Sequence, residues 1–110
     1  MKRIYISGPM TGLPDYNFAA FEAAEKLLRK TVPSAEIINP HELSRGVDQH
    51  NAEWEDYLKL DLRAMLDCDT VVILPGWHNS KGALLEIHVA TSVNIQIVCL
   101  EFFERYANGH

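Results

Sequence analysis

The sequence lacks the features that mark several large classes of protein. Its two cysteines, Cys68 and Cys99, form neither a disulfide framework nor the closely spaced ligands of a metal site. Both lie beside predicted strands, so we expect buried, reduced thiols and a cytoplasmic location. No apolar run approaches the roughly 20 residues of a membrane span. The N-terminal apolar run is interrupted at Ser7, which makes it too short for a signal peptide.

Positive charge is also scarce. The chain has 10 Lys and Arg against 15 Asp and Glu, a net charge of -5, and its basic residues form no cluster. Because nucleic-acid polymers are bound through basic patches, we exclude DNA and RNA as partners, although backbone amides can still hold a small anion. The five histidines lack metal-ligand spacing, so we expect no metal. Residues 7–12 form neither a Walker loop nor a dinucleotide fingerprint, and we expect no cofactor.

What the sequence does contain is a regular alternation of strand-like and helix-like segments. Strands are predicted at 3–7, 35–39, 69–74 and 95–100, helices at 16–30, 52–66 and 83–93, a polar loop at 41–50, and a short helix or tail at 101–108. The apolar run 71–74 is typical of a parallel strand covered on both faces. We therefore predict a single α/β domain spanning residues 1–110. It should be a flavodoxin-like three-layer sandwich with a parallel sheet of four or five strands.

Three loops leave the carboxyl ends of these strands, where doubly wound folds bind their ligands. They are residues 7–14, the segment from Asn39 onward, and residues 75–82. Their glycines and small side chains let backbone amides approach a ligand, and a helix N-terminus suits an anion or a polar sugar. The sequence does not decide whether Trp77 stacks on a base or only covers its loop. The candidate binding residues are Ser7, Gly8, Pro9, Met10, Gly12, Asn39, Gly76, Trp77, Ser80 and Gly82.

Two carboxylates stand on helix stripes that are otherwise apolar. Asp61 has this position in segment 52–66, and Glu86 has it in segment 83–93. A buried carboxylate is costly unless it is paired, and burial raises its pKa. Either group could be structural, with Asp61 paired to an Arg or capping an amide and Glu86 bonded to the first turn of its own helix. We interpret the pair as functional because Glu86 follows Gly82 of the ligand-facing loop by four residues.

The position of Asp61 along its helix sets a condition on this interpretation. An unbroken helix over 52–66 would place Asp61 nearer the middle of the sheet than the crevice. We therefore expect a bend in this helix if Asp61 serves the ligand site. Otherwise Asp61 is structural.

Three segments together resemble the nucleoside 2-deoxyribosyltransferase-like family. They are residues 5–12, Asp61 with the strand 69–73, and residues 80–86, which read Ser-x-Gly-x-x-x-Glu. The resemblance implies a flavodoxin-like fold and an enzyme that moves deoxyribose between bases or hydrolyses deoxynucleoside 5'-monophosphates. It also implies that Glu86 is the nucleophile, Asp61 contacts sugar or base, and Tyr5 positions the nucleophile. Ser80 occupies the position at which members of the family contact the 5' group. Members of the hydrolase branch carry an Arg in their first loop, where this chain has Pro-Met-Thr at 9–11.

A second reading of the same residues stays open. The segment 74–76 leading to Gly82 and Glu86 also resembles the Pro-Gly-Gly…Glu region of Rossmann-like proteins, which favours a non-catalytic nucleotide sensor. An adaptor without a ligand would leave both stripe carboxylates unexplained. In each case we expect a homodimer or higher assembly, because a small chain buries little surface and Trp54, Tyr57 and the segment 97–103 are apolar.

Overall fold

Four short parallel strands form the centre of the fold in the computed structural model, which describes residues 1–47 and 51–109. The strands are β1 (Arg3–Ser7), β2 (Glu36–Ile38), β3 (Thr70–Ile73) and β4 (Gln96–Cys99). Their order is β2-β1-β3-β4 and every neighbouring pair is parallel. This architecture confirms the predicted α/β fold of flavodoxin-like type, with four strands in the described residues.

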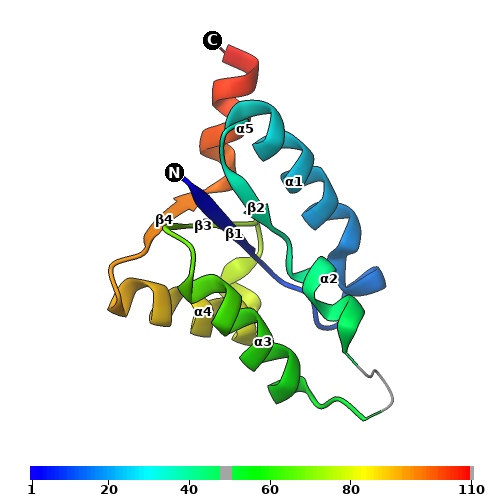
Figure 1. Ribbon diagram of the computed structural model, residues 1–110. Coiled ribbons are helices and arrows are strands. Elements are labelled where there is room, and N and C mark those ends of the chain that lie inside the picture. The colour runs from blue at the N-terminus through cyan, green and yellow to red at the C-terminus, as the bar shows by residue number, and fades with distance from the viewer. Residues whose placement is uncertain (48–50, 110) are drawn as a thin grey trace.

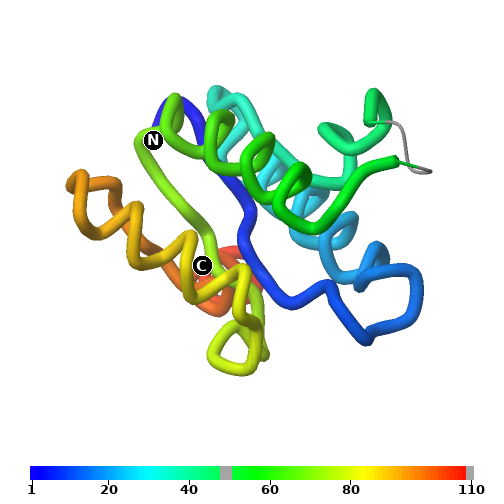
Figure 2. Tube along the Cα trace, turned by 90° about the horizontal axis from the view of Figure 1, so that it is seen from below, coloured from blue at the N-terminus to red at the C-terminus, as the bar shows by residue number. Residues whose placement is uncertain are grey.

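Helices cover both faces of this sheet (Figure 1). One face carries α1 (Phe18–Thr31) and α5 (Leu100–Gly109), and the other carries α3 (Trp54–Leu66) and α4 (Lys81–Ser92). Short helical turns occupy the loops: η1 (Pro14–Asn17), α2 (Pro40–Leu43), η2 (Ser44–Gly46) and η3 (Trp77–Asn79). Seen from below, β1 runs through the middle of the molecule and the loop after it extends outward before α1 begins (Figure 2). None of the helices in the described residues is long and apolar enough to cross a membrane.

Alternation along β1 divides the core in two. Ile4 and Ile6 point toward α1 and α5, whereas Tyr5 and Ser7 point toward α3 and α4. The other buried members of the first cluster are Phe21, Ala24, Leu28, Ala35, Ile37, Val72, Leu74 and Phe103. Those of the second are Met65, Cys68, Val71, Ile73 and Ala90. One strand thus serves two chemically different faces.

Several expectations need correction. The polar segment 41–50 does not begin as a loop, because the Asn39 side chain accepts from the His41 amide and starts the short helix α2. Residues 48–50 of this segment lie outside the described residues. Cys68 is buried as expected, but Cys99 is exposed because it ends the edge strand β4. In the segment 97–103, Phe103 is buried inside the fold, whereas Phe102 is exposed.

Candidate active site

A cleft of about 900 Å³ opens at the carboxyl end of β1, between α3 and α4. In the strand order, the chain leaves β1 for β2 on one side and later returns to β3 on the other. Such a switch point is where doubly wound sheets place their ligands. The cleft is lined by Gly8, Pro9, Met10, Thr11, Tyr16, Phe21, Pro40, His41, Ser44, Trp54, Tyr57, Leu58, Asp61, Asn79, Ser80, Lys81, Gly82, Ala83 and Glu86.

Glu86 lies in the second turn of α4 and faces the cleft with only 6% of its surface exposed. Both of its carboxylate oxygens accept hydrogen bonds from β1. The Tyr5 hydroxyl donates to Oε2 at 2.5 Å, and the Ser7 hydroxyl donates to Oε1 at 2.8 Å. The first turn of α4 has its own cap, because the Ala83 amide donates to the Ser80 hydroxyl. The carboxylate of Glu86 is therefore held by the sheet.

The electrostatics of this group are set by burial and by these two hydroxyls. Burial raises the pKa of Glu86, and the hydrogen bonds from Tyr5 and Ser7 act in the opposite direction because they favour the ionised carboxylate. Burial, followed by the charges of Glu86 and Asp61, raises the pKa of Tyr5 well above its ordinary value. Tyr5 is thus a neutral phenol that donates a hydrogen bond to Glu86.

Asp61 reaches the same cleft from α3. The expected bend is absent, since α3 is one continuous helix from Trp54 to Leu66. The expectation was wrong because the cleft extends along α3 as far as the start of its third turn, and Trp54, Tyr57 and Asp61 line it together. None of the ion pairs among the described residues involves Asp61. The structural alternative of an arginine partner therefore does not hold there.

The two carboxyl groups differ in their protonation. Burial, followed by the negative charge of Glu86, raises the pKa of Asp61 from 3.8 to about 8. Two hydroxyl groups donate hydrogen bonds to Glu86 and favour its charged form. Among the described residues, no side chain donates such a hydrogen bond to the carboxyl group of Asp61. With a pKa of about 8, Asp61 accordingly keeps its proton at neutral pH. Because the negative charge of Glu86 contributes to this raised pKa, Glu86 is the first of the two carboxyls to ionise. Two carboxyls driven apart in this way can divide the roles of acid and nucleophile.

Five of the predicted binding residues line the cleft, namely Gly8, Pro9, Met10, Ser80 and Gly82. A Cβ at Gly8 would lie 2.8 Å from Leu74 Cβ, so this glycine lets the first loop pass directly over the end of β3. A Cβ at Gly82 would meet nothing within 4 Å, so the start of α4 is open toward the cleft. Ser80 remains beside it as the helix cap.

The other predicted binding residues lie elsewhere in the described structure. Ser7 is fully buried behind Glu86, and Gly12 sits in an exposed turn with a φ of 84°. Gly76 has a φ of 87° and starts η3, while Trp77 packs against the core on the α3 and α4 side. Asn39 does not touch the cleft either, because its side chain is engaged in capping α2. None of the five lines the cleft: Ser7 supports Glu86 from β1, and the other four shape the loops.

Sequence reasoning missed several cleft residues with aromatic or basic side chains. Trp54 and Tyr57 share the helical stripe of Asp61, so that stripe held the signal. His41 follows the end of β2, and Lys81 lies between two predicted binding residues, with its Nζ 4.9 Å from the centroid of the Trp54 ring. Tyr16 gave no signal, because its place depends on an unusual backbone conformation.

Fold and site together define a small α/β protein whose cleft holds a paired acid and carboxylate. Comparison with known families gives a match to one described as Domain of unknown function (DUF4406) over residues 2–99. The match covers every cleft residue named above, and the chain belongs to this family. None of the curated proteins matches the sequence.

Proposed function

We propose that this protein cleaves or transfers the N-glycosidic bond of a 2'-deoxyribonucleoside or its 5'-monophosphate through a covalent glycosyl-Glu86 intermediate. The observation that carries the proposal is the state of Glu86. It is a buried carboxylate that faces a cleft, held by Tyr5 and Ser7, with a protonated carboxyl at Asp61 beside it. The resemblance of segments 5–12 and 80–86 to nucleoside 2-deoxyribosyltransferases supports the same chemistry.

The two carboxyls account for both halves of the reaction. An oxygen of Glu86 attacks the anomeric carbon, the bond from that carbon to the base nitrogen breaks, and its electron pair stays on the base. Asp61 gives its proton to the leaving base as this charge develops. Water, or a second base, then attacks the same carbon and releases Glu86, while Asp61 takes back a proton. This is the logic of a retaining glycosidase applied to an N-glycoside.

The remaining walls of the cleft fit a nucleoside. Trp54 and Tyr57 offer aromatic surface for a flat base, and a volume of about 900 Å³ accommodates one such molecule. Ser80, Lys81 and Gly82 line the cleft at the start of α4 and provide a place for the 5' group. We propose no metal or cofactor, because the steps need only the two carboxyls.

The test is a panel of deoxynucleosides and their 5'-monophosphates incubated with the protein, with and without a second free base. Release of base from at least one substrate is expected, and a new nucleoside in the second arm identifies transfer. Glu86→Gln is the matched control. Calorimetric binding of a nucleotide with no base release would favour the non-catalytic sensor, and neither binding nor release would contradict both.

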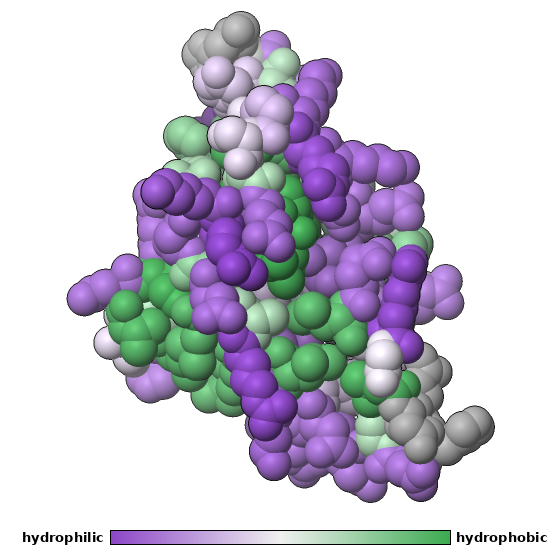
Figure 3. All heavy atoms as spheres, viewed as in Figure 1, coloured by the Kyte–Doolittle hydropathy of each residue, from purple (hydrophilic) through white to green (hydrophobic). Residues whose placement is uncertain are grey.

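We further propose a cytoplasmic homodimer or higher assembly. The two free cysteines fit a reducing compartment. Leu84 and Leu85 are exposed on α4, and hydrophobic side chains gather over α3 and α4 on the face seen in Figure 3. An exposed apolar surface of this kind is typical of an interface. Light scattering should give at least twice the monomer mass for the parent and the monomer mass for Leu85→Glu, and a monomeric parent would contradict the proposal.

A further inference from the structure

One wall of the cleft has a strained backbone. Three consecutive residues after β1 adopt left-handed conformations: Asp15 with a φ of 49°, Tyr16 with 52° and Asn17 with 65°. None of them is glycine, the residue that adopts this region without cost. Such strain persists only where surrounding contacts hold it, and it concentrates at ligand sites. Since Tyr16 lines the cleft, the conformation determines the shape of the wall.

Two side-chain hydrogen bonds hold this segment. The Asn17 amide nitrogen donates to the Pro9 carbonyl at 2.9 Å. Nε2 of His41 lies 3.1 Å from the Tyr16 carbonyl oxygen. Because a carbonyl can only accept, the proton of this bond belongs to His41 Nε2. His41 therefore joins the end of β2 to the loop after β1 across one side of the cleft.

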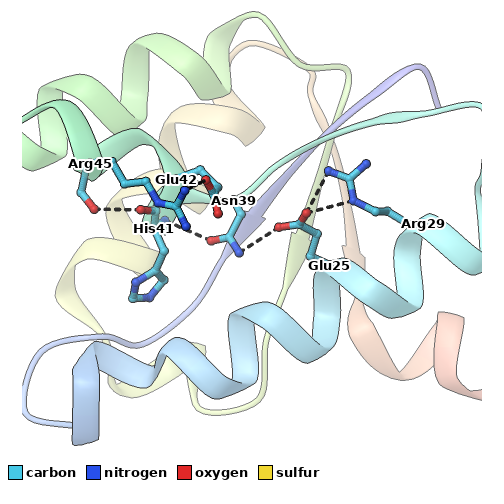
Figure 4. Close-up of polar contacts among 7 residues, drawn as sticks. Glu25, Arg29, Asn39, His41, Glu42 and Arg45 are labelled. Carbon is cyan, nitrogen blue, oxygen red and sulfur yellow. Dashed lines mark hydrogen bonds and ion pairs between the residues drawn. The ribbon is translucent and has the colours of Figure 1, made fainter.

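His41 is itself fixed from two directions. Its ring makes edge contacts with Phe21 and Phe18, with centroids 5.0 and 5.4 Å away. Its backbone amide donates to Asn39, and the Asn39 side-chain amide donates to Glu25 of α1 at 3.1 Å (Figure 4). The Glu25 carboxylate is paired with Arg29 at 2.8 Å, one turn further along α1. A chain of polar contacts through Asn39 and Glu25 thus connects His41 in α2 to α1.

We propose that His41 is a positioning residue, which holds segment 15–17 through the Tyr16 carbonyl and so fixes the cleft wall against which the ligand binds. Asn39 then acts through His41, which accounts for a polar residue that is buried at the end of β2 yet does not line the cleft. Burial lowers the pKa of His41, so its ring is neutral at physiological pH and the Nε2–H tautomer carries the bond. That ligand is the nucleoside of the proposed function, on which this role of His41 in ligand binding rests.

The test separates the hydrogen bond from the ring packing. His41→Phe keeps an aromatic ring against Phe18 and Phe21 but removes the donor, whereas His41→Gln can restore a donor near the position of Nε2. Backbone amide order parameters for 15–17 should fall from about 0.85 in the parent to below about 0.6 in His41→Phe, and return in His41→Gln. KM should rise about tenfold in His41→Phe with kcat little changed, because only ligand binding depends on the wall. His88→Phe, the same change on the exposed face of α4, should alter neither the order parameters of 15–17 nor KM.

Each outcome decides the inference. Unchanged order parameters in His41→Phe would contradict it, and so would a mobile segment with an unchanged KM. A parent without turnover would contradict the proposed function, while the order parameters would still decide the role of His41. The native protein gives a check that needs no variant, through the imidazole nitrogen shifts of His41 in NMR spectra. They should report the Nε2–H tautomer, and an Nδ1–H tautomer would overturn the proposal.

Discussion

The two faces of the sheet use the same strand for opposite purposes. Toward α1 and α5, β1 presents Ile4 and Ile6, which join a buried cluster of apolar side chains. Toward α3 and α4 it presents Tyr5 and Ser7, which meet the buried carboxylate of Glu86. The first arrangement stabilises the folded state by removing apolar surface from water. The second lowers the stability of the folded state, because a buried carboxylate costs free energy even when it is hydrogen-bonded.

This difference indicates where stability and function lie in so small a domain. The buried polar groups beside α3 and α4 cost free energy that apolar burial on both faces offsets, and polar groups that are costly to bury are typical of functional sites. Substitutions on the α1 and α5 side should therefore change stability with little effect on the reaction. Substitutions of the polar groups on the α3 and α4 side, Tyr5, Asp61 and Glu86, should instead act mainly on the reaction.

The largest effect is expected for Glu86→Gln. The amide keeps the shape of the side chain but cannot form the glycosyl ester, so kcat should fall by about a thousandfold or more. The neutral amide is cheaper to bury, so the free energy of unfolding should stay equal or increase. Base release and urea denaturation measure the two quantities. Release at the parental rate would remove Glu86 from the mechanism.

Leu28→Ala provides the opposite case on the other face. Leu28 is fully buried in the cluster between the sheet, α1 and α5. Its truncation should lower the free energy of unfolding by about 2–5 kcal/mol through lost burial and the cavity left behind. The kcat of the folded fraction should remain close to that of the parent. A large loss of kcat at temperatures where the variant is folded would show that the two faces are not separable.

The sequence allowed the sheet and the paired carboxylates to be predicted, each for a local reason. The apolar run 71–74 is long enough to indicate a buried strand, and Glu86 and Asp61 stand out as charges on apolar stripes. The partners of Glu86 could not be predicted from periodicity, and Tyr5 was expected to position Glu86 only because of the family resemblance. Tyr5 lies 81 residues away in an apolar strand, where its ring alone accounts for its presence. Cys99 was misjudged because its exposure depends on the order of the strands, which periodicity does not give.

Asp61 should give a smaller, pH-dependent effect. Its pKa is raised from 3.8 to about 8, so between these pH values the folded state holds a proton that the unfolded state has released. The free energy of unfolding should therefore fall as the pH rises from about 4 to about 8, and Asp61→Asn should flatten this slope. Turnover should drop above about pH 8 as the proton donor ionises. Asp61→Asn should lower kcat about a hundredfold at neutral pH.

Two measurements check this prediction together. Urea denaturation at several pH values compares the slopes of the parent and Asp61→Asn, and the pH dependence of kcat locates the ionisation in the complex. An equal slope in both proteins would show that Asp61 is not the group with the raised pKa. A kcat in Asp61→Asn that matches the parent would restrict Asp61 to a structural role.

The smallest effect is expected for Tyr5→Phe, which tests the comparison within a single strand. The ring remains in the core, but Glu86 loses the hydrogen bond to Oε2, so the free energy of unfolding should fall by about 1–3 kcal/mol. That bond lowers the pKa of Glu86, so its loss raises this pKa and moves the acid limb of the kcat/KM profile to higher pH. The rate at the optimum should fall about tenfold.

The neighbouring residue supplies the matched control for this change. Ile6 is the next residue of β1, points to the opposite face, and is fully buried there. Ile6→Val should cost about 0.5–1.5 kcal/mol of stability, a range that overlaps the loss expected for Tyr5→Phe, and leave the acid limb where it is. An acid limb that stays fixed in Tyr5→Phe would mean that Tyr5 does not set the ionisation of Glu86. A limb that moves equally in both variants would show that the shift comes from general loosening of the sheet and not from the lost hydroxyl.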